Sequence, residues 1–93
     1  MTYSIDKNII AKSINHYGEE IQATVCMEEC AELIQALSKM KRGIDAKDNL
    51  VEEIADVLIC IEMLKQLYNV LDLDIESWIM QKQQRVMDEM KEA

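Results

Sequence analysis

The scarcity of turn formers most limits what this chain can fold into, because its 93 residues include no proline and only two glycines. β-Sandwiches and barrels need many turns, and their strands favour β-branched and aromatic residues. The chain has no phenylalanine, one tryptophan and three tyrosines. Alanine, glutamate, lysine, leucine, glutamine and methionine, which favour helices, are abundant. We therefore predict an all-α fold.

Apolar side chains recur every three or four residues in four segments, as in helices that bury one face. Gly18 and Gly43 follow the first two segments and are suitable helix ends. Asn49 precedes Glu52 by three residues, as in a capping box, and Asp74 is a suitable N-cap for the last segment. We expect helices over residues from 4 or 6 to 16, 19–42, 49–68 and 74–93.

A second subunit is expected from the length of the chain. A domain of this size buries only about 60–65% of its unfolded surface, so a lone monomer is marginally stable. Three cysteines cannot pair evenly and no zinc-ligand spacing is present. Residues 57–61 are all apolar, so a helix through them would carry apolar side chains on every face. This predicts a helix that is buried on most sides. We expect one domain over residues 1–93 that forms a homodimer or a dimer of dimers.

The charge of the chain excludes several classes of partner. Ten basic against eighteen acidic residues give a net charge of −8, which disfavours binding to nucleic acids and to anionic membranes. The sequence has no apolar run of membrane-spanning length and no secretory signal, and its cysteines are unpaired. We expect a soluble, cytoplasmic protein. An anionic substrate would need metal ions to approach it.

Two pairs of acidic residues occupy the two longest predicted helices. Glu29 and Glu32 are three residues apart and share one helix face, and Glu53 and Asp56 repeat this spacing. The residues between the pairs allow a turn and an antiparallel return, so we expect all four carboxylates to meet. Two like charges 4 Å apart repel by about 4 kcal/mol at an effective dielectric of 20. Asp56, directly before the apolar run, should be the most costly to bury.

Carboxylates without histidine or cysteine partners are ligands that Mg²⁺ or Mn²⁺ prefers. A metal site is therefore predicted at the two acidic pairs. The alternative is a non-catalytic helical dimerisation or adaptor module, because acidic residues at this spacing usually mark a solvated helix face. That alternative accounts for the short length and the helical pattern, but it gives no reason for an acid at position 56.

The strings EECAEL at residues 28–33 and EEIADV at residues 52–57 resemble the signature of the MazG-type nucleoside triphosphate pyrophosphohydrolases, ExxE followed by ExxD. The resemblance covers nearly the whole chain. It implies an all-α, four-helix MazG-like bundle completed by oligomerisation. It also implies hydrolysis of a (deoxy)nucleoside triphosphate to the monophosphate and pyrophosphate. In this family Mg²⁺ is held by four acids, which correspond here to Glu29, Glu32, Glu53 and Asp56.

The resemblance implies further roles for single residues. A metal-activated water would attack the α-phosphorus, with Glu28 or Glu29 as the general base. The family directs basic residues of the last helix toward the phosphates, and Lys82 and Arg85 are the candidates here. Gln22 lies two turns before Glu29 on about the same face and could hydrogen-bond a base. A related pyrophosphohydrolase acting on another pyrophosphate compound, such as phosphoribosyl-ATP or an alarmone, stays open.

More cations flank the connection between the two acidic helices. Most are expected to complement a helix dipole at the surface, and one could reach a phosphate. They are Lys39, Lys41, Arg42 and Lys47.

Overall fold

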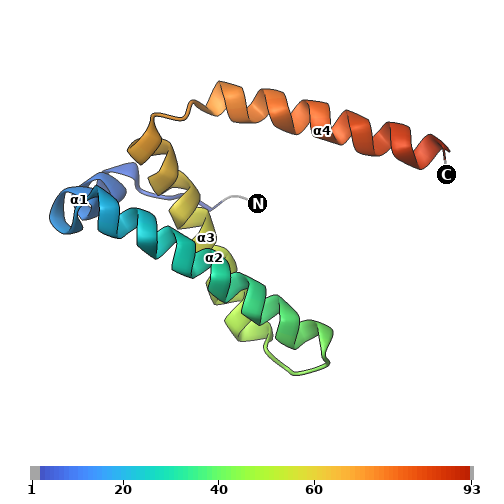
Figure 1. The fold of residues 1–93 in the computed structure, drawn as a ribbon, viewed down its shortest axis with the longest axis horizontal. Coiled ribbons are helices and arrows are strands. Elements are labelled where there is room, and N and C mark those ends of the chain that lie inside the picture. The colour runs from blue at the N-terminus through green and yellow to red at the C-terminus, as the bar shows by residue number, and fades with distance from the viewer. Residues whose placement is uncertain (1–2, 93) are drawn as a thin grey trace.

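The computed structural model describes residues 3–92, and these form four helices without any strand. The prediction of an all-α fold is confirmed (Figure 1). Each helix lies within a few residues of the position that the apolar periodicity indicated. The helices are α1 (Lys7–Tyr17), α2 (Glu19–Lys41), α3 (Lys47–Tyr68) and α4 (Asp72–Glu92).

Local interactions define both ends of α1. The carboxylate of Asp6 accepts hydrogen bonds from the backbone N–H groups of Asn8, at 2.9 Å, and Ile9, at 3.4 Å, which makes it the N-cap. Gly18 ends the helix with a φ of 97°, and its N–H donates to the carbonyl of Ile14 at 2.8 Å. Because α2 begins at the next residue, the positive φ of Gly18 turns the chain directly from one helix into the next.

Two helices begin earlier than predicted. α3 begins at Lys47 with Ala46 as its N-cap and no capping side chain, so the capping box expected at Asn49 does not form. The side-chain amide of Asn49 instead donates to Glu53 Oε1 at 3.4 Å. α4 begins at Asp72 rather than Asp74. The carboxylate of Asp72 forms an ion pair with Lys65 of α3, which holds the start of α4 against the end of α3.

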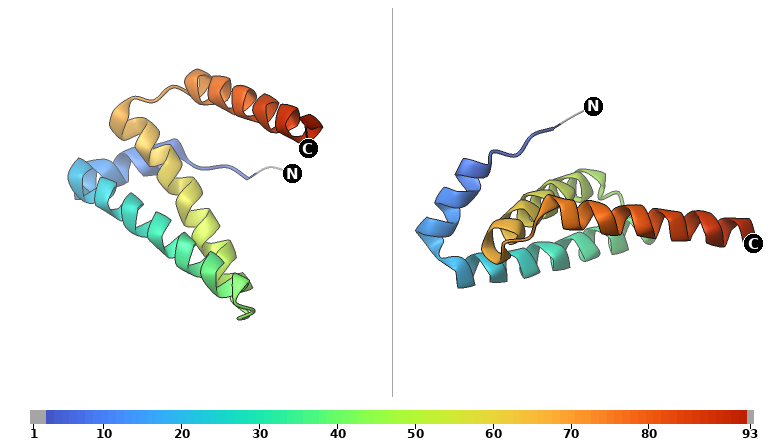
Figure 2. Two further views of the ribbon diagram at one scale, coloured as in Figure 1. Left: turned by 45° about the vertical axis from the view of Figure 1, so that its right-hand side comes forward. Right: turned by 90° about the horizontal axis from the view of Figure 1, so that it is seen from above.

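The core lies where α1 crosses the hairpin that α2 and α3 form (Figures 1 and 2). α2 and α3 run antiparallel and share the longest interface of the described chain. One small cluster of buried apolar side chains joins the three helices. Its members are Ile10, Cys26, Cys60 and Met63.

α4 packs against none of the other three helices in the described part of the chain, and it projects away from the end of α3 (Figure 2). None of its described residues is buried, and Trp78 is 57% exposed. The radius of gyration is 16.2 Å, against about 12 Å for a compact domain of this length. One chain therefore does not close a four-helix bundle by itself.

The apolar run at residues 57–61 is also less covered than predicted. Only Cys60 is buried, while Ile59 and Ile61 are 42% and 43% exposed. The prediction of burial on most sides is therefore wrong for the single chain, because α4 does not fold back over α3. Between residues 3 and 92, no helix has both the length and the apolar character required to cross a membrane.

We expect Met63→Ala to lower the free energy of unfolding by about 2–4 kcal/mol, because it removes a buried side chain from a small core. Met27→Ala, at a position that is 73% exposed, is the matched control and should change the free energy by less than about 0.5 kcal/mol. Urea denaturation followed by circular dichroism measures both. Equal effects of the two substitutions would contradict this assignment of the core.

Candidate metal centre

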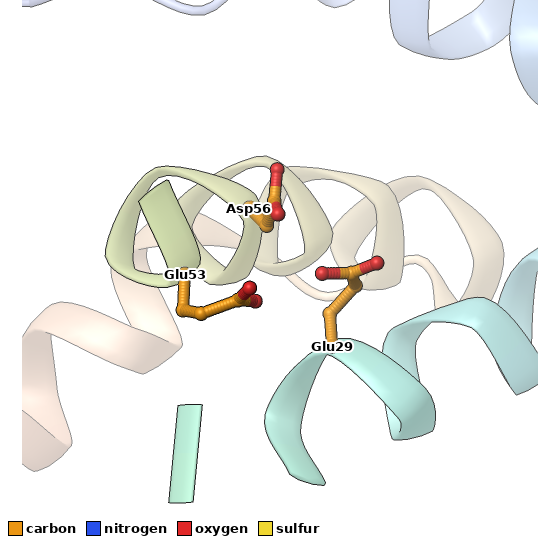
Figure 3. A group of neighbouring side chains, drawn as sticks. All are labelled: Glu29, Glu53 and Asp56. Carbon is orange, nitrogen blue, oxygen red and sulfur yellow. The ribbon is translucent and has the colours of Figure 1, made fainter. Parts of the chain in front are cut away.

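Three acidic side chains converge between α2 and α3. Glu29 comes from α2, and Glu53 and Asp56 come from one face of α3, as their spacing predicted. One carboxylate oxygen from each residue lies within 4.8 Å of the others. Figure 3 shows Glu29 extending from α2 toward Glu53 and Asp56 on α3. This distance is short enough for a single cation to contact all three.

Glu32, the fourth acid predicted for the centre, lies one turn after Glu29 and is exposed. Its negative charge contributes to the raised pKa of Glu53, so it is a close neighbour of that carboxylate. The structure thus places three of the four predicted ligands in one cluster and the fourth beside it.

Burial is greatest at Glu53, which is only 5% exposed, whereas Asp56 is half-buried. The cost of burial that was expected at Asp56 therefore falls mainly on Glu53, because Glu53 is the residue that the seam between the two helices covers. Glu53 Oε2 and Glu29 Oε2 are both buried without a hydrogen-bond partner among the described residues. A buried polar oxygen without a partner is rare in folded proteins and calls for a ligand.

The crowding of the carboxylates alters their protonation. Burial raises the pKa of Glu29 from 4.5 to about 7, and the neighbouring carboxylate of Asp56 adds to this effect. Burial also raises the pKa of Glu53, with further contributions from Glu32. Both shifts have the sign expected when negative charges are brought together away from water. A bound divalent cation would favour the ionised carboxylates and so would lower the pKa of both residues.

The donor set fits a hard divalent cation. It consists of carboxylate oxygens, which suit Mg²⁺ and Mn²⁺, and no histidine or cysteine belongs to the cluster in the described residues. The amide of Asn49 holds the other oxygen of Glu53, as outer partners commonly orient metal ligands. Asn49, predicted from the sequence to begin a capping box, has this role instead, and its spacing of four residues from Glu53 is compatible with such a contact.

The other predicted site residues lie outside the cluster. Glu28 is exposed on α2, and Gln22, two turns before Glu29, is buried at 6% exposure. The Lys82 ammonium lies 5.7 Å from the ring centre of Trp78, and Arg85 lines a shallow groove on α4. Because α4 packs on none of the other described helices, a single chain does not bring these two cations to the carboxylates.

Residues 18–91 match the family model of the MazG nucleotide pyrophosphohydrolase domain. The match includes both acidic pairs and covers α2, α3 and nearly all of α4, so the chain belongs to this family. The family consists of hydrolases that act on phosphoric anhydride bonds of nucleotides. Neither the curated proteins nor the solved structures include a significant match to the chain.

We expect the free energy of unfolding of the metal-free protein to fall as the pH rises from about 4.5 to about 7. Glu29 keeps a proton in the folded state that the unfolded chain releases in this range, so the folded state loses relative stability as that proton dissociates. Thermal unfolding followed by circular dichroism across this range measures the effect. The Lys65–Asp72 pair does not titrate in this pH range, because the pairing raises the pKa of Lys65 and lowers the pKa of Asp72.

The Glu29→Gln variant is the control for this pH dependence and should flatten it. Mg²⁺ should raise the melting temperature of the wild type more at pH 8 than at pH 5, because it binds the ionised carboxylates. A slope that is the same in the variant and the wild type would contradict the assignment to Glu29.

Proposed function

We propose that the protein hydrolyses a nucleoside triphosphate to the monophosphate and pyrophosphate, using Mg²⁺ held by the acidic cluster. The observation that supports this most is the meeting of Glu29, Glu53 and Asp56 within 4.8 Å, with two buried oxygens that have no partner in the described chain. An adaptor module would have no use for this arrangement. Membership of the MazG family supports the same class of reaction.

Glu29, Glu53 and Asp56, with Glu32 beside them, would hold the metal ion. Mg²⁺, when bound there, would neutralise phosphate charge and lower the pKa of a water molecule. The water attacks the α-phosphorus, and pyrophosphate leaves with the electron pair of the broken P–O bond. Glu29 is a better candidate than Glu28 for accepting the proton of the water, because it faces the cluster and Glu28 lies outside it.

Lys82 and Arg85 of α4 are proposed to contact the phosphates, and Gln22 is proposed to contact the base. The cation requirement follows from the charge of the chain, since a net charge of −8 repels a triphosphate. α4 carries both basic residues on a helix that its own chain leaves unpacked. A second subunit is therefore part of the proposal.

We propose that the chain forms a homodimer or a dimer of dimers. Its accessible surface is 7638 Å², whereas a compact monomer of 10.8 kDa exposes about 5,500 Å². The excess of about 2,100 Å² is of the size that obligate subunits bury. Much of it is apolar and lies on the outer side of α3 and on α4. Examples are Val51, Ile54, Ile59, Trp78, Ile79 and Val86.

Glu53→Gln and Asp56→Asn should each lower the release of pyrophosphate from nucleoside triphosphates by at least about 100-fold, because each removes a charged ligand from the metal centre. Without metal, both variants should melt at an equal or higher temperature than the wild type, because carboxylate repulsion is relieved. A colorimetric pyrophosphate assay over a panel of nucleoside triphosphates measures the activity.

Glu52→Gln is the matched control for these variants, since Glu52 is the exposed neighbour of Glu53 on α3. It should keep activity within about twofold of the wild type. Wild-type protein that releases no pyrophosphate from any substrate of the panel would overturn the proposed function.

Ile79→Glu should shift the protein from the oligomer to the monomer in sedimentation velocity, because it puts a charge among the exposed apolar residues of α4, which include Trp78 and Val86. Gln81→Glu adds the same charge on the opposite side of the helix and should leave the oligomer intact. A wild-type protein that sediments as a folded, active monomer at micromolar concentration would contradict the proposal.

A further inference from the structure

The connection between α2 and α3 borders a cavity of about 580 Å³. The last turn of α2, the connecting loop and the first turn of α3 line it. This volume can hold a diphosphate group with part of its hydration shell. The cavity lies at the end of the same hairpin that carries the acidic cluster.

Positive charge is concentrated around this cavity. Four of the ten lysine and arginine residues of the chain fall between positions 39 and 47, and three of them, Lys39, Arg42 and Lys47, line the cavity. Asp45 and Asp48 also line it, so the cations are in excess by one charge. Arg42 Nε donates to the carbonyl of Ser38 at 3.3 Å, which holds the guanidinium at the end of α2.

Helix dipoles do not account for all three cations. Lys39 and Arg42 lie at the C-terminal end of α2, where a positive charge is favoured. Lys47 is the first residue of α3, where the dipole disfavours a cation and favours an anion. The N-cap, Ala46, offers no side chain to the first amides of α3. Asp48 already places one negative charge in the first turn of α3. Lys47 has no ion-pair partner among the described residues, and a bound anion would give it one.

The cavity adjoins the acidic cluster through one residue. Asn49 lines the cavity, and its amide donates to Glu53 Oε1 at 3.4 Å. The other oxygen of Glu53 is buried and has no partner in the described part of the chain. A ligand with one phosphate at the carboxylates could therefore extend along α3 past Asn49 into the cavity.

We propose that this cavity binds the diphosphate part of the substrate, first as the β- and γ-phosphates and then as the leaving pyrophosphate. The inference rests on the proposed function, and it assigns the loop cations a role in binding the leaving group. The class of ligand is an anionic diphosphate. A nucleoside monophosphate has no group that reaches these cations.

The test is isothermal titration calorimetry of the full chain with sodium pyrophosphate in the presence of Mg²⁺. Combining Lys39→Gln, Arg42→Gln and Lys47→Gln should weaken pyrophosphate binding about tenfold, since each exposed charge contributes modestly. Binding of a nucleoside monophosphate should stay within about twofold of the wild type. The same variant should show a raised KM for the triphosphate. The single substitutions, starting with Lys47→Gln, serve as a second set if the combined variant unfolds.

Lys41→Gln is the matched control, because Lys41 lies in the same last turn of α2 but does not line the cavity. It should leave pyrophosphate affinity within about twofold of the wild type. The inference is overturned if wild type binds no pyrophosphate, if the variants bind it as wild type does, or if the control or the monophosphate is affected equally. Wild type that hydrolyses triphosphates while the variants keep full pyrophosphate affinity would refute this inference alone. A lack of hydrolysis would refute the proposed function.

Discussion

Repulsion among carboxylates in the seam between α2 and α3 is the constraint on which the rest of the structure depends. The same seam contains the small buried thiols of the core, and the Cys26 thiol donates to the carbonyl of Cys60 at 3.7 Å. Glu29 follows Cys26 by one turn, and Asp56 precedes Cys60 by one turn. Packing of small side chains brings the helices close and thereby forces the acids together, so the site and the core are produced by one contact.

This arrangement also explains why so much apolar surface is left outside. The middle of the hairpin's inner face is occupied by acids and small thiols, whereas several large aliphatic residues of the first two thirds of α3 are exposed. Ile54 and Ile59 are more than 40% exposed, and the buried cluster is limited to four side chains. A core this small gives little stability to a single chain. Association of subunits is the way to cover the outer face without displacing the acids.

Sequence reasoning was most successful where the determinants were local. The apolar period located four helices, and the two acidic spacings predicted a cluster, because both follow from residues three or four apart on a helix. Which of the four acids is most buried does not follow from the sequence. That choice depends on the rotation of α3 about its axis relative to α2, which no local spacing determines. The caps predicted at Asn49 and Asp74 lie inside their helices, because α3 begins at Lys47 and α4 begins at Asp72. Contacts of Asn49 with Glu53 and of Asp72 with Lys65 accompany these early starts.

The position of α4 is determined by the short connection between α3 and α4. Asn69 ends α3 in the left-handed conformation, and Lys65 pairs with Glu62 of its own helix and Asp72 of α4. These contacts set where α4 starts, but they bury none of its described length. The hairpin therefore carries the acidic cluster and the adjoining cationic cavity as one packed unit, whereas Lys82 and Arg85 are carried by a helix with no packing partner in the described chain. Under the proposed function, the hairpin would hold the reacting phosphates, and subunit assembly would bring in the remaining cations.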